Sequence, residues 1–277
     1  MRNIEAKKAL VYGKGISGMG AAAALDKCGV PCDVCDDASF DGINVADYDL
    51  IVVSPSIPLT HRVFEKAAAA GAEVIGEIEL GARLCDKPLI AVTGTNGKTT
   101  VTRLIGKALG YSRDACVTGN VGRSFALDAC DDHDIYICET SSFQLETVKT
   151  FAPSIAVVTN ITEDHLDRHG SFENYARTKM RVAAAQTSAD YLILNVDEIP
   201  ECALKGFNPS ADVLYTSRKS VVRGAYLSDN KFYWFDEPIC RVNRMRMMGM
   251  HNAENALSMT AVAKLLGVTN SDIVRAL

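Results

Sequence analysis

The residues best placed to do chemistry lie in the stretch "GTNGKTT", residues 94–100. Gly94 and Gly97 would let successive backbone N–H groups turn toward the oxygens of a phosphate. Lys98 can reach the β- and γ-phosphates of a nucleotide, and Thr99 is placed to put its hydroxyl on Mg²⁺. The stretch therefore predicts a phosphate-binding loop.

The surroundings of this loop favour the same interpretation, although the loop departs from the usual motif. An apolar run at 88–93 predicts a buried strand before it, and "KTTVTRLIGKAL" at 98–109 predicts a helix after it. The usual phosphate loop carries a further glycine five residues before Gly97, where this chain has Val92. The loop is thus a variant, and the motif alone does not name the nucleotide or the family.

Acidic and polar residues follow two further apolar runs. Glu139 ends "IYICE", and Asn160, Thr162, Asp164 and His165 follow "SIAVVT". Open parallel sheets bind their ligands at the carboxyl ends of the strands, and Mg²⁺ prefers carboxylate oxygens. Glu139 can therefore serve as a Mg²⁺ ligand, and the second run repeats the arrangement.

Two other spacings could suggest a metal site. His165 and His169 have the i, i+4 spacing of a helical zinc pair, but no H-E-x-x-H motif is present. Cys32 and Cys35 form a C-x-x-C, yet the segment reads as a short strand that turns the two thiols to opposite faces. No second such pair completes a set of four ligands. Hydrogen-bonding and structural roles are favoured for these residues.

A second glycine cluster lies near the N-terminus. Gly13, Gly15 and Gly18 form G-x-G-x-x-G between a strand-like and a helix-like run, and Asp36 ends the next apolar run. The pattern is typical of dinucleotide-binding proteins. Its donors are backbone amides and a helix dipole, however, which bind almost any nucleotide diphosphate. An NAD-dependent or nucleotide-sensing protein and a Rossmann-like domain without a dinucleotide both stay open here.

Alternating strand and helix patterns predict an α/β fold with parallel sheets. The pattern restarts near residue 87, and residues 220–245 alternate like a β-meander. We predict a Rossmann-like N-terminal domain at 1–87. A P-loop ATPase-type central domain with a parallel sheet and the small meander is predicted at 88–277.

The composition excludes several classes of protein. The net charge is −5 with a pI near 5.6, and no basic stripe stands out, which argues against a nucleic-acid partner. No apolar run approaches the ~20 residues of a membrane helix, and the N-terminus lacks the apolar stretch of a signal peptide. Nine scattered cysteines are typical of reduced thiols. We predict a cytoplasmic protein without membrane insertion.

Four motifs together carry a family resemblance. "GTNGKTT", "ETSSFQLE", "TNITEDHLDRHGSFENYARTK" and "GMHNAENALSMTA", in this order, resemble the Mur ligases of peptidoglycan synthesis. "SSFQLE" and the N-terminal "GKGISGMG" are most similar to the D-glutamate-adding branch of that family. The resemblance covers the whole chain. It implies that the shortened loop is the family's own form and that its phosphate belongs to ATP.

The resemblance assigns roles to individual residues. The ATP phosphates would be held by Gly94, Thr95, Asn96, Gly97, Lys98, Thr99 and Thr100, with Lys98 on the γ-phosphate, and the adenine by Asn252 and Asn255. One Mg²⁺ would be held by Thr99 and Glu139, and a second by His165 and Lys179. Lys179 is expected to be carbamylated, since an ammonium repels Mg²⁺ whereas a carbamate offers anionic oxygens. Lys98, Glu139, His165 and Lys179 form the implied catalytic set.

The sugar-nucleotide substrate is assigned in the same way. Its uridine diphosphate end would be held by Ile16, Ser17 and Asp36, and its muramoyl part by Asn120, Ser141 and His165. Two positions depart from the family pattern. Ser56 stands where the family often has the glycine of S-P-G, and Ala38 where some members carry an arginine. Both departures put the contacts to the uracil nucleotide in doubt.

The implied reaction is an ATP-dependent amide ligation. ATP would phosphorylate the carboxylate of UDP-N-acetylmuramoyl-L-alanine, and the amine of D-glutamate would displace phosphate from the acyl phosphate. A sister ligase that adds another amino acid is the alternative. Family members carry a third, C-terminal domain that contacts the amino acid, whereas this chain stops at Leu277. We therefore expect a monomeric two-domain fragment that is inactive alone and does not reveal its amino acid.

Overall fold

The structure is a computed structural model that describes residues 4–246 and 249–277. The chain forms two compact units. The first contains the chain up to Lys87 together with residues 118–132 and 141–151. The second contains residues 88–117, 133–140 and 152–277. Asn120 and Ser141 therefore group with the first unit, although both follow strands of the second unit's sheet.

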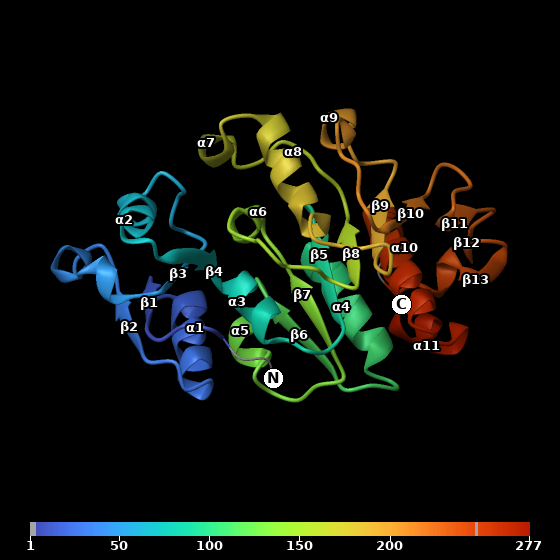
Figure 1. Ribbon diagram of the computed structural model, residues 1–277. Helices are drawn as coiled ribbons and strands as arrows, with labels where there is room; N and C mark the ends of the chain where they lie inside the picture. The colour runs from blue at the N-terminus through green and yellow to red at the C-terminus, as the bar shows by residue number, and fades with distance from the viewer. Residues whose placement is uncertain (1–3, 247–248) are drawn as a thin grey trace. The chain divides into compact units, whose positions relative to one another are not determined.

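A four-stranded parallel sheet forms the centre of the first unit. Its strand order is β2-β1-β3-β4, and all three strand pairs are parallel. The strands are β1 (Ala9–Tyr12), β2 (Cys32–Cys35), β3 (Leu50–Val53) and β4 (Glu73–Gly76). The helices are α1 (Ile16–Lys27), α2 (Arg62–Ala70), α3 (Glu77–Leu84), α5 (Phe125–Asp128) and α6 (Ser142–Leu145) (Figure 1). The two central strands are buried at every residue, which explains why they read as continuous apolar runs.

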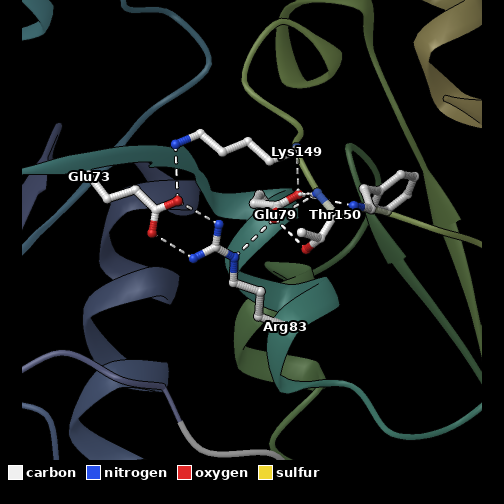
Figure 2. Close-up of polar contacts among 6 residues, drawn as sticks. Glu73, Glu79, Arg83, Lys149 and Thr150 are labelled. Carbon is white, nitrogen blue, oxygen red and sulfur yellow. Dashed lines mark hydrogen bonds and ion pairs between the residues drawn. The ribbon is translucent and has the colours of Figure 1, made fainter. Parts of the chain in front are cut away.

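A buried carboxylate holds the chain that follows α6. Glu79 of α3 is fully buried and accepts main-chain N–H bonds from Lys149, Thr150 and Phe151 at 2.9–3.1 Å. Arg83 donates its Nε to Glu79 and both terminal nitrogens to Glu73 (Figure 2). Because a buried charge is costly unless it is bonded on all sides, this network fixes the segment against α3.

A nine-stranded sheet forms the centre of the second unit. Its strand order is β13-β12-β11-β10-β9-β8-β5-β7-β6. The pairs from β7 to β11 are parallel, while β11, β12 and β13 form an antiparallel meander. The strands are β5 (Leu89–Thr93), β6 (Ala115–Gly119), β7 (Ile135–Glu139), β8 (Ile155–Val158), β9 (Tyr191–Asn195), β10 (Asp212–Ser217), β11 (Gly224–Ser228), β12 (Lys231–Trp234) and β13 (Glu237–Arg241).

The helices of this unit are α4 (Lys98–Leu109), α7 (Leu166–His169), α8 (Phe172–Met180), α9 (Glu201–Leu204), α10 (Met250–Leu265) and α11 (Asn270–Ala276). Helices α4 and α10 pack on each other. The apolar residues of α4 recur at helical spacing and join the core beneath α10; they include Val101, Leu104, Ile105 and Ala108. The predicted fold class is confirmed, including the meander.

Two strands, β6 and β10, were not predicted from the sequence. β6 and β10 have mixed exposure, because "ACVTG" and "DVLYTS" carry polar residues among the apolar ones. These polar residues interrupt the apolar pattern by which a strand is recognised from sequence, so the local signal was weak. Within residues 4–246 and 249–277, no helix combines the length and the apolar character needed to cross a membrane.

Candidate functional site

The phosphate loop joins the end of β5 to the start of α4, and both of its glycines are required by geometry. Gly94 has φ +145° and Gly97 has φ +81°, a region that disfavours residues with a side chain. A Cβ on Gly94 would lie 2.0 Å from Oγ1 of Thr159, and one on Gly97 would lie 2.4 Å from Oδ1 of Asn255. The loop is thus packed between the end of β8 and helix α10.

Two lysine amines are bonded to carbonyl groups of this loop. Lys98 donates from Nζ to the Thr95 carbonyl at 2.8 Å, and Lys179 donates from Nζ to the Gly94 carbonyl at 2.8 Å. Burial lowers the pKa of Lys98. Burial, with the positive charge of Lys98 nearby, lowers the pKa of Lys179 to about 7. Lys179 thus stands close to neutrality at physiological pH, which an exposed lysine does not.

Thr99 and Glu139 form a pair of oxygen donors beside the loop. Oγ1 of Thr99 donates to Oε2 of Glu139 at 2.7 Å, and the Glu139 side chain is almost fully buried at the carboxyl end of β7. In the described part of the chain, no three His, Cys, Asp or Glu side chains gather closely enough to cage a metal. Mg²⁺ commonly takes one or two protein oxygens and fills its remaining positions with phosphate oxygens and waters. The pair therefore fits a Mg²⁺ that is bound together with a nucleotide.

Lys179 and Tyr175 lie one helical turn apart on the same face of α8. The Lys179 amine lies 4.7 Å from the centre of the Tyr175 ring, and the Tyr175 hydroxyl is 3.0 Å from Oγ1 of Thr95. Oγ1 of Thr95 also donates to the Thr162 carbonyl and accepts from its N–H. These contacts tie α8 and the segment after β8 to the phosphate loop.

His165 sits in a strained backbone conformation. Its φ is +50°, in the left-handed region that residues other than glycine rarely adopt. Its imidazole Nε2 lies 3.4 Å from Oδ2 of Asp164, and its main-chain N–H donates to Oδ1 of the same residue. The Asp164 charge acts on both Lys98 and Lys179. Strain of this kind is common at functional positions.

The remaining predicted nucleotide contacts are distributed over α4 and α10. Asn255 is buried against Gly97, whereas Asn252 lies half-buried on the first turn of α10. Thr100 is half-buried in the first turn of α4, and the Asn96 side chain is exposed. The structure therefore brings Asn255, Lys98, Thr99, Glu139 and Lys179 to one phosphate loop.

The first unit carries the residues predicted for the sugar nucleotide. Ile16 is 77% exposed at the start of α1, where Ser17 also lies, and the Asn120 position after β6 is exposed. Asp36 is paired with Lys14 at 2.8 Å, and this bond, with one from Ser39, lowers the Asp36 pKa to about 2.

Ser141 caps helix α6 in the first unit. Its hydroxyl accepts from the Gln144 N–H, and the Gln144 side chain accepts from the Ser141 N–H, which together form a capping box. Its side chain is therefore already engaged within α6.

Sequence reasoning assigned no role to Thr159 or Tyr175, and it named Asn160 only as a polar residue after an apolar strand, although all three contact the loop. Oγ1 of Thr159 donates to the Asn96 carbonyl at 2.7 Å, and Asn160 bonds both Thr95 and Asn96. Their one signal in the sequence was position, because Thr159 and Asn160 directly follow an apolar strand. Tyr175 gave no signal beyond its i, i+4 spacing to Lys179.

Comparison with known proteins gives matches to a single family. The Mur ligase middle domain matches residues 92–263. UDP-N-acetylmuramoylalanine–D-glutamate ligase from Pelotomaculum thermopropionicum is 35% identical, over 99% of this chain and 66% of its own length. The same-named ligase from Streptococcus uberis is 37% identical, over 98% of this chain and 65% of its own length. The chain thus spans about two-thirds of the length of these relatives.

Solved structures share the fold at low sequence identity. UDP-N-acetylmuramate:L-alanyl-gamma-D-glutamyl-meso-diaminopimelate ligase from Neisseria meningitides superposes with a TM-score of 0.67 at 18% identity, covering 98% of this chain and 97% of that one. MurF ligase from Thermotoga maritima, solved with ADP, has a TM-score of 0.54 at 18% identity, covering 82% of this chain and 63% of that one. The middle-domain match takes in the phosphate loop, Glu139, Lys179 and Asn255. This chain belongs to the Mur ligase family.

Proposed function

We propose that the protein is an ATP-dependent ligase that joins D-glutamate to UDP-N-acetylmuramoyl-L-alanine in peptidoglycan precursor synthesis. The observation that carries the proposal is the group of Lys98, Thr99, Glu139 and Lys179 around one glycine loop. The names of the D-glutamate ligase relatives support the choice of substrates. A sister ligase that adds another amino acid is the second candidate, because solved structures with this fold include ligases named for 2,6-diaminopimelate and for D-alanyl-D-alanine.

The loop and its lysines would bind and activate the phosphates of ATP. The N–H groups at the start of α4 point along the helix axis, where they would meet a phosphate, and the helix dipole would favour its negative charge. Lys98 would leave the Thr95 carbonyl and donate to the γ-phosphate, which neutralises charge where it develops during phosphoryl transfer. This neutralisation matters because the attacking group, a carboxylate, is itself negative.

Thr99 and Glu139 would hold one Mg²⁺, and His165 with a carbamylated Lys179 would hold a second. Bound there, Mg²⁺ would shield the repulsion between the carboxylate and the phosphate. The buried Lys179 amine supports carbamylation, since CO₂ adds to a neutral amine and burial favours the neutral form. Asn255 would contact the nucleotide beside Gly97, and Asn252 would contact the adenine.

In the first unit, the start of α1 with Ile16, Ser17 and Asp36 would hold the uridine diphosphate end. Asn120 and Ser141 of this unit would contact the muramoyl part; His165, which belongs to the second unit, is the third residue that the family resemblance assigns to it. We propose that residues 1–87 form a Rossmann-like domain for this substrate and residues 88–277 an ATP-binding domain, and that the protein works as a cytoplasmic monomer.

Carbamylation can be measured directly on Lys179. In ¹³C-bicarbonate, we expect a carbamate signal by ¹³C NMR that rises as the pH passes through about 7, because that is where the Lys179 amine becomes neutral. An ordinary lysine, with a pKa near 10.4, would still be almost fully protonated at pH 8.

Lys179→Met should remove this signal, and Lys107→Met, a control on α4, should keep it. A signal that survives in Lys179→Met would place the carbamate elsewhere.

The first unit should prefer uridine diphosphate ligands to NADH. The acid that a dinucleotide fold aims at the adenosine ribose is Asp36, and here its carboxylate is already bonded to Lys14 and Ser39. We expect calorimetry to show UDP-N-acetylmuramoyl-L-alanine binding at least about tenfold more tightly than NADH, which corresponds to roughly 1.4 kcal/mol. Tight NADH binding with no response to the uridine compound would support the dinucleotide interpretation instead.

The proposed reaction is tested by amino-acid-dependent phosphate release. The full-length protein encoded by the gene would be given ATP, Mg²⁺, UDP-N-acetylmuramoyl-L-alanine and a panel of amino acids. We expect phosphate and amide product with D-glutamate and little with L-glutamate, L-lysine or diaminopimelate. Product with a different amino acid alone would select a sister ligase.

A further inference from the structure

One side-chain amide forms two hydrogen bonds with the backbone of a single residue of the phosphate loop. Asn160 lies two residues beyond the end of β8. Its Oδ1 accepts the N–H of Asn96 at 2.8 Å, and its Nδ2 donates to the carbonyl of Asn96 at 2.9 Å. The main-chain carbonyl of Asn160 also accepts the N–H of Thr95 at 2.9 Å. Asn160 therefore bonds two consecutive loop residues, using both its side chain and its backbone.

Only certain side chains can form this pair of hydrogen bonds. A donor and an acceptor must stand side by side at the end of a short side chain, and a carboxamide has both. Turning the amide over would set its NH₂ against the Asn96 N–H and its oxygen against the Asn96 carbonyl. An aspartate carboxylate could accept from the N–H but would repel the carbonyl.

Both side-chain hydrogen bonds of Asn160 reach the loop at Asn96, next to Gly97. Asn96 stands between Thr95 and Gly97, and its own side chain is exposed. Gly97 has no side chain to limit its backbone, so the direction of its N–H must be set from outside. Thr159 adds a third bond to the same residue, from Oγ1 to the Asn96 carbonyl at 2.7 Å.

We propose that Asn160 is a positioning residue that sets the phosphate loop in its nucleotide-binding conformation before the nucleotide arrives. It touches no phosphate itself and acts through Asn96 and Thr95. A loop whose N–H groups are already aimed loses less entropy on binding, and therefore binds more tightly. This inference rests on the proposed ATP site.

Asn160→Ala should loosen the loop and weaken nucleotide binding. We expect faster hydrogen exchange in a peptide that covers residues 94–98, measured without nucleotide. We also expect the calorimetric Kd for Mg²⁺ with the non-hydrolysable analogue AMP-PNP to rise about tenfold, as the loss of two hydrogen bonds would produce.

Asn160→Asp supplies a signature that a general loss of structure would not give. At pH 8 the carboxylate faces the Asn96 carbonyl, so the Kd should rise about as much as in Asn160→Ala. At pH 4.5, close to the ordinary aspartate pKa of about 3.9, which the facing carbonyl acts to raise, a protonated carboxyl regains an O–H donor for that carbonyl, so the Kd relative to the unaltered chain should fall at least about twofold. The ratio of the Kd of Asn160→Asp to the Kd of the unaltered chain cancels the effects of pH that both proteins share. These include effects on the surrounding charged groups, which are Lys98, Glu139, Asp164, His165 and Lys179.

Asn230→Asp, in the exposed turn between β11 and β12, is the matched control for the added charge. It should change neither the exchange rate nor the Kd.

The proposal is overturned if Asn160→Ala leaves exchange at 94–98 unchanged, or if Asn160→Asp matches Asn160→Ala at both pH values. If the unaltered chain binds no nucleotide, the proposed function fails, and the exchange experiment still decides whether Asn160 holds the loop. If Asn160→Ala does not fold, the pH comparison of Asn160→Asp decides.

Discussion

Lys98→Ala should lower kcat of the proposed ligase at least about a thousandfold in the full-length protein. The Lys98 amine already lies on the loop, 2.8 Å from the Thr95 carbonyl, and we propose that it turns from there to a bound γ-phosphate. Electrostatic stabilisation of a transferring phosphoryl group by a single donor is worth several kcal/mol, and each 1.36 kcal/mol is about tenfold in rate. Steady-state phosphate release gives the measurement.

The fold should survive this substitution, since the alanine removes a charge that is partly buried and costly to keep there. Thermal unfolding should stay within a few degrees of the unaltered protein. Arg103→Ala, which removes an exposed positive charge from the same helix, is the matched control and should keep its activity. Activity of Lys98→Ala within tenfold of the unaltered protein would rule out the role given to this lysine.

The sequence could predict this part of the site because its information is local. Gly94, Gly97, Lys98 and Thr99 fall within six residues, and the strand and helix around them have strong apolar periodicity. The position of Glu139 could be predicted as well, since this acid is the last residue of an apolar strand. Each of these residues owes its place to its own strand, loop or helix, which the pattern of apolar residues reveals.

The supports of the site were beyond the reach of local pattern. Asn160 bonds Asn96 from 64 residues away, and Tyr175 bonds Thr95 from 80 residues away. Whether β8 lies beside β5 is decided by sheet order, and no spacing within either strand records it. The family resemblance named Asn255, but not that its amide packs on Gly97. Residues that act through such distant contacts need the folded arrangement to be recognised.

The same limit applies to Glu79, whose main-chain partners lie 70–72 residues further along the chain. In sequence it is one acid in "GEIELGARL", and helical spacing there predicts only its pair with Arg83. In the structure it is fully buried and accepts from three consecutive main-chain N–H groups, the Thr150 hydroxyl and Arg83. Burial acts to raise its pKa, but these bonds together hold the pKa below its ordinary value.

Glu79→Gln should therefore destabilise the first unit by about 3 kcal/mol at pH 7. The glutamine would bring an NH₂ group against main-chain N–H donors and would leave Arg83 without its buried charge partner. Urea unfolding followed by circular dichroism should show the loss as a lower midpoint. Glu65→Gln, an exposed position on α2, removes the same charge without a network and should shift the midpoint by little.

The pH dependence separates this charge from simple packing. A carboxylate whose pKa is lower in the folded than in the unfolded protein stabilises the fold at pH values above the unfolded value, near 4.5 for glutamate. That contribution is lost as the pH falls further, toward the lower pKa that Glu79 has in the folded protein. The stability difference between Glu79→Gln and the unaltered chain should thus be constant from pH 7 to about pH 5 and shrink below it. A difference that stays the same down to pH 3 would mean that shape, and not the ionised carboxylate, holds Lys149, Thr150 and Phe151 in place.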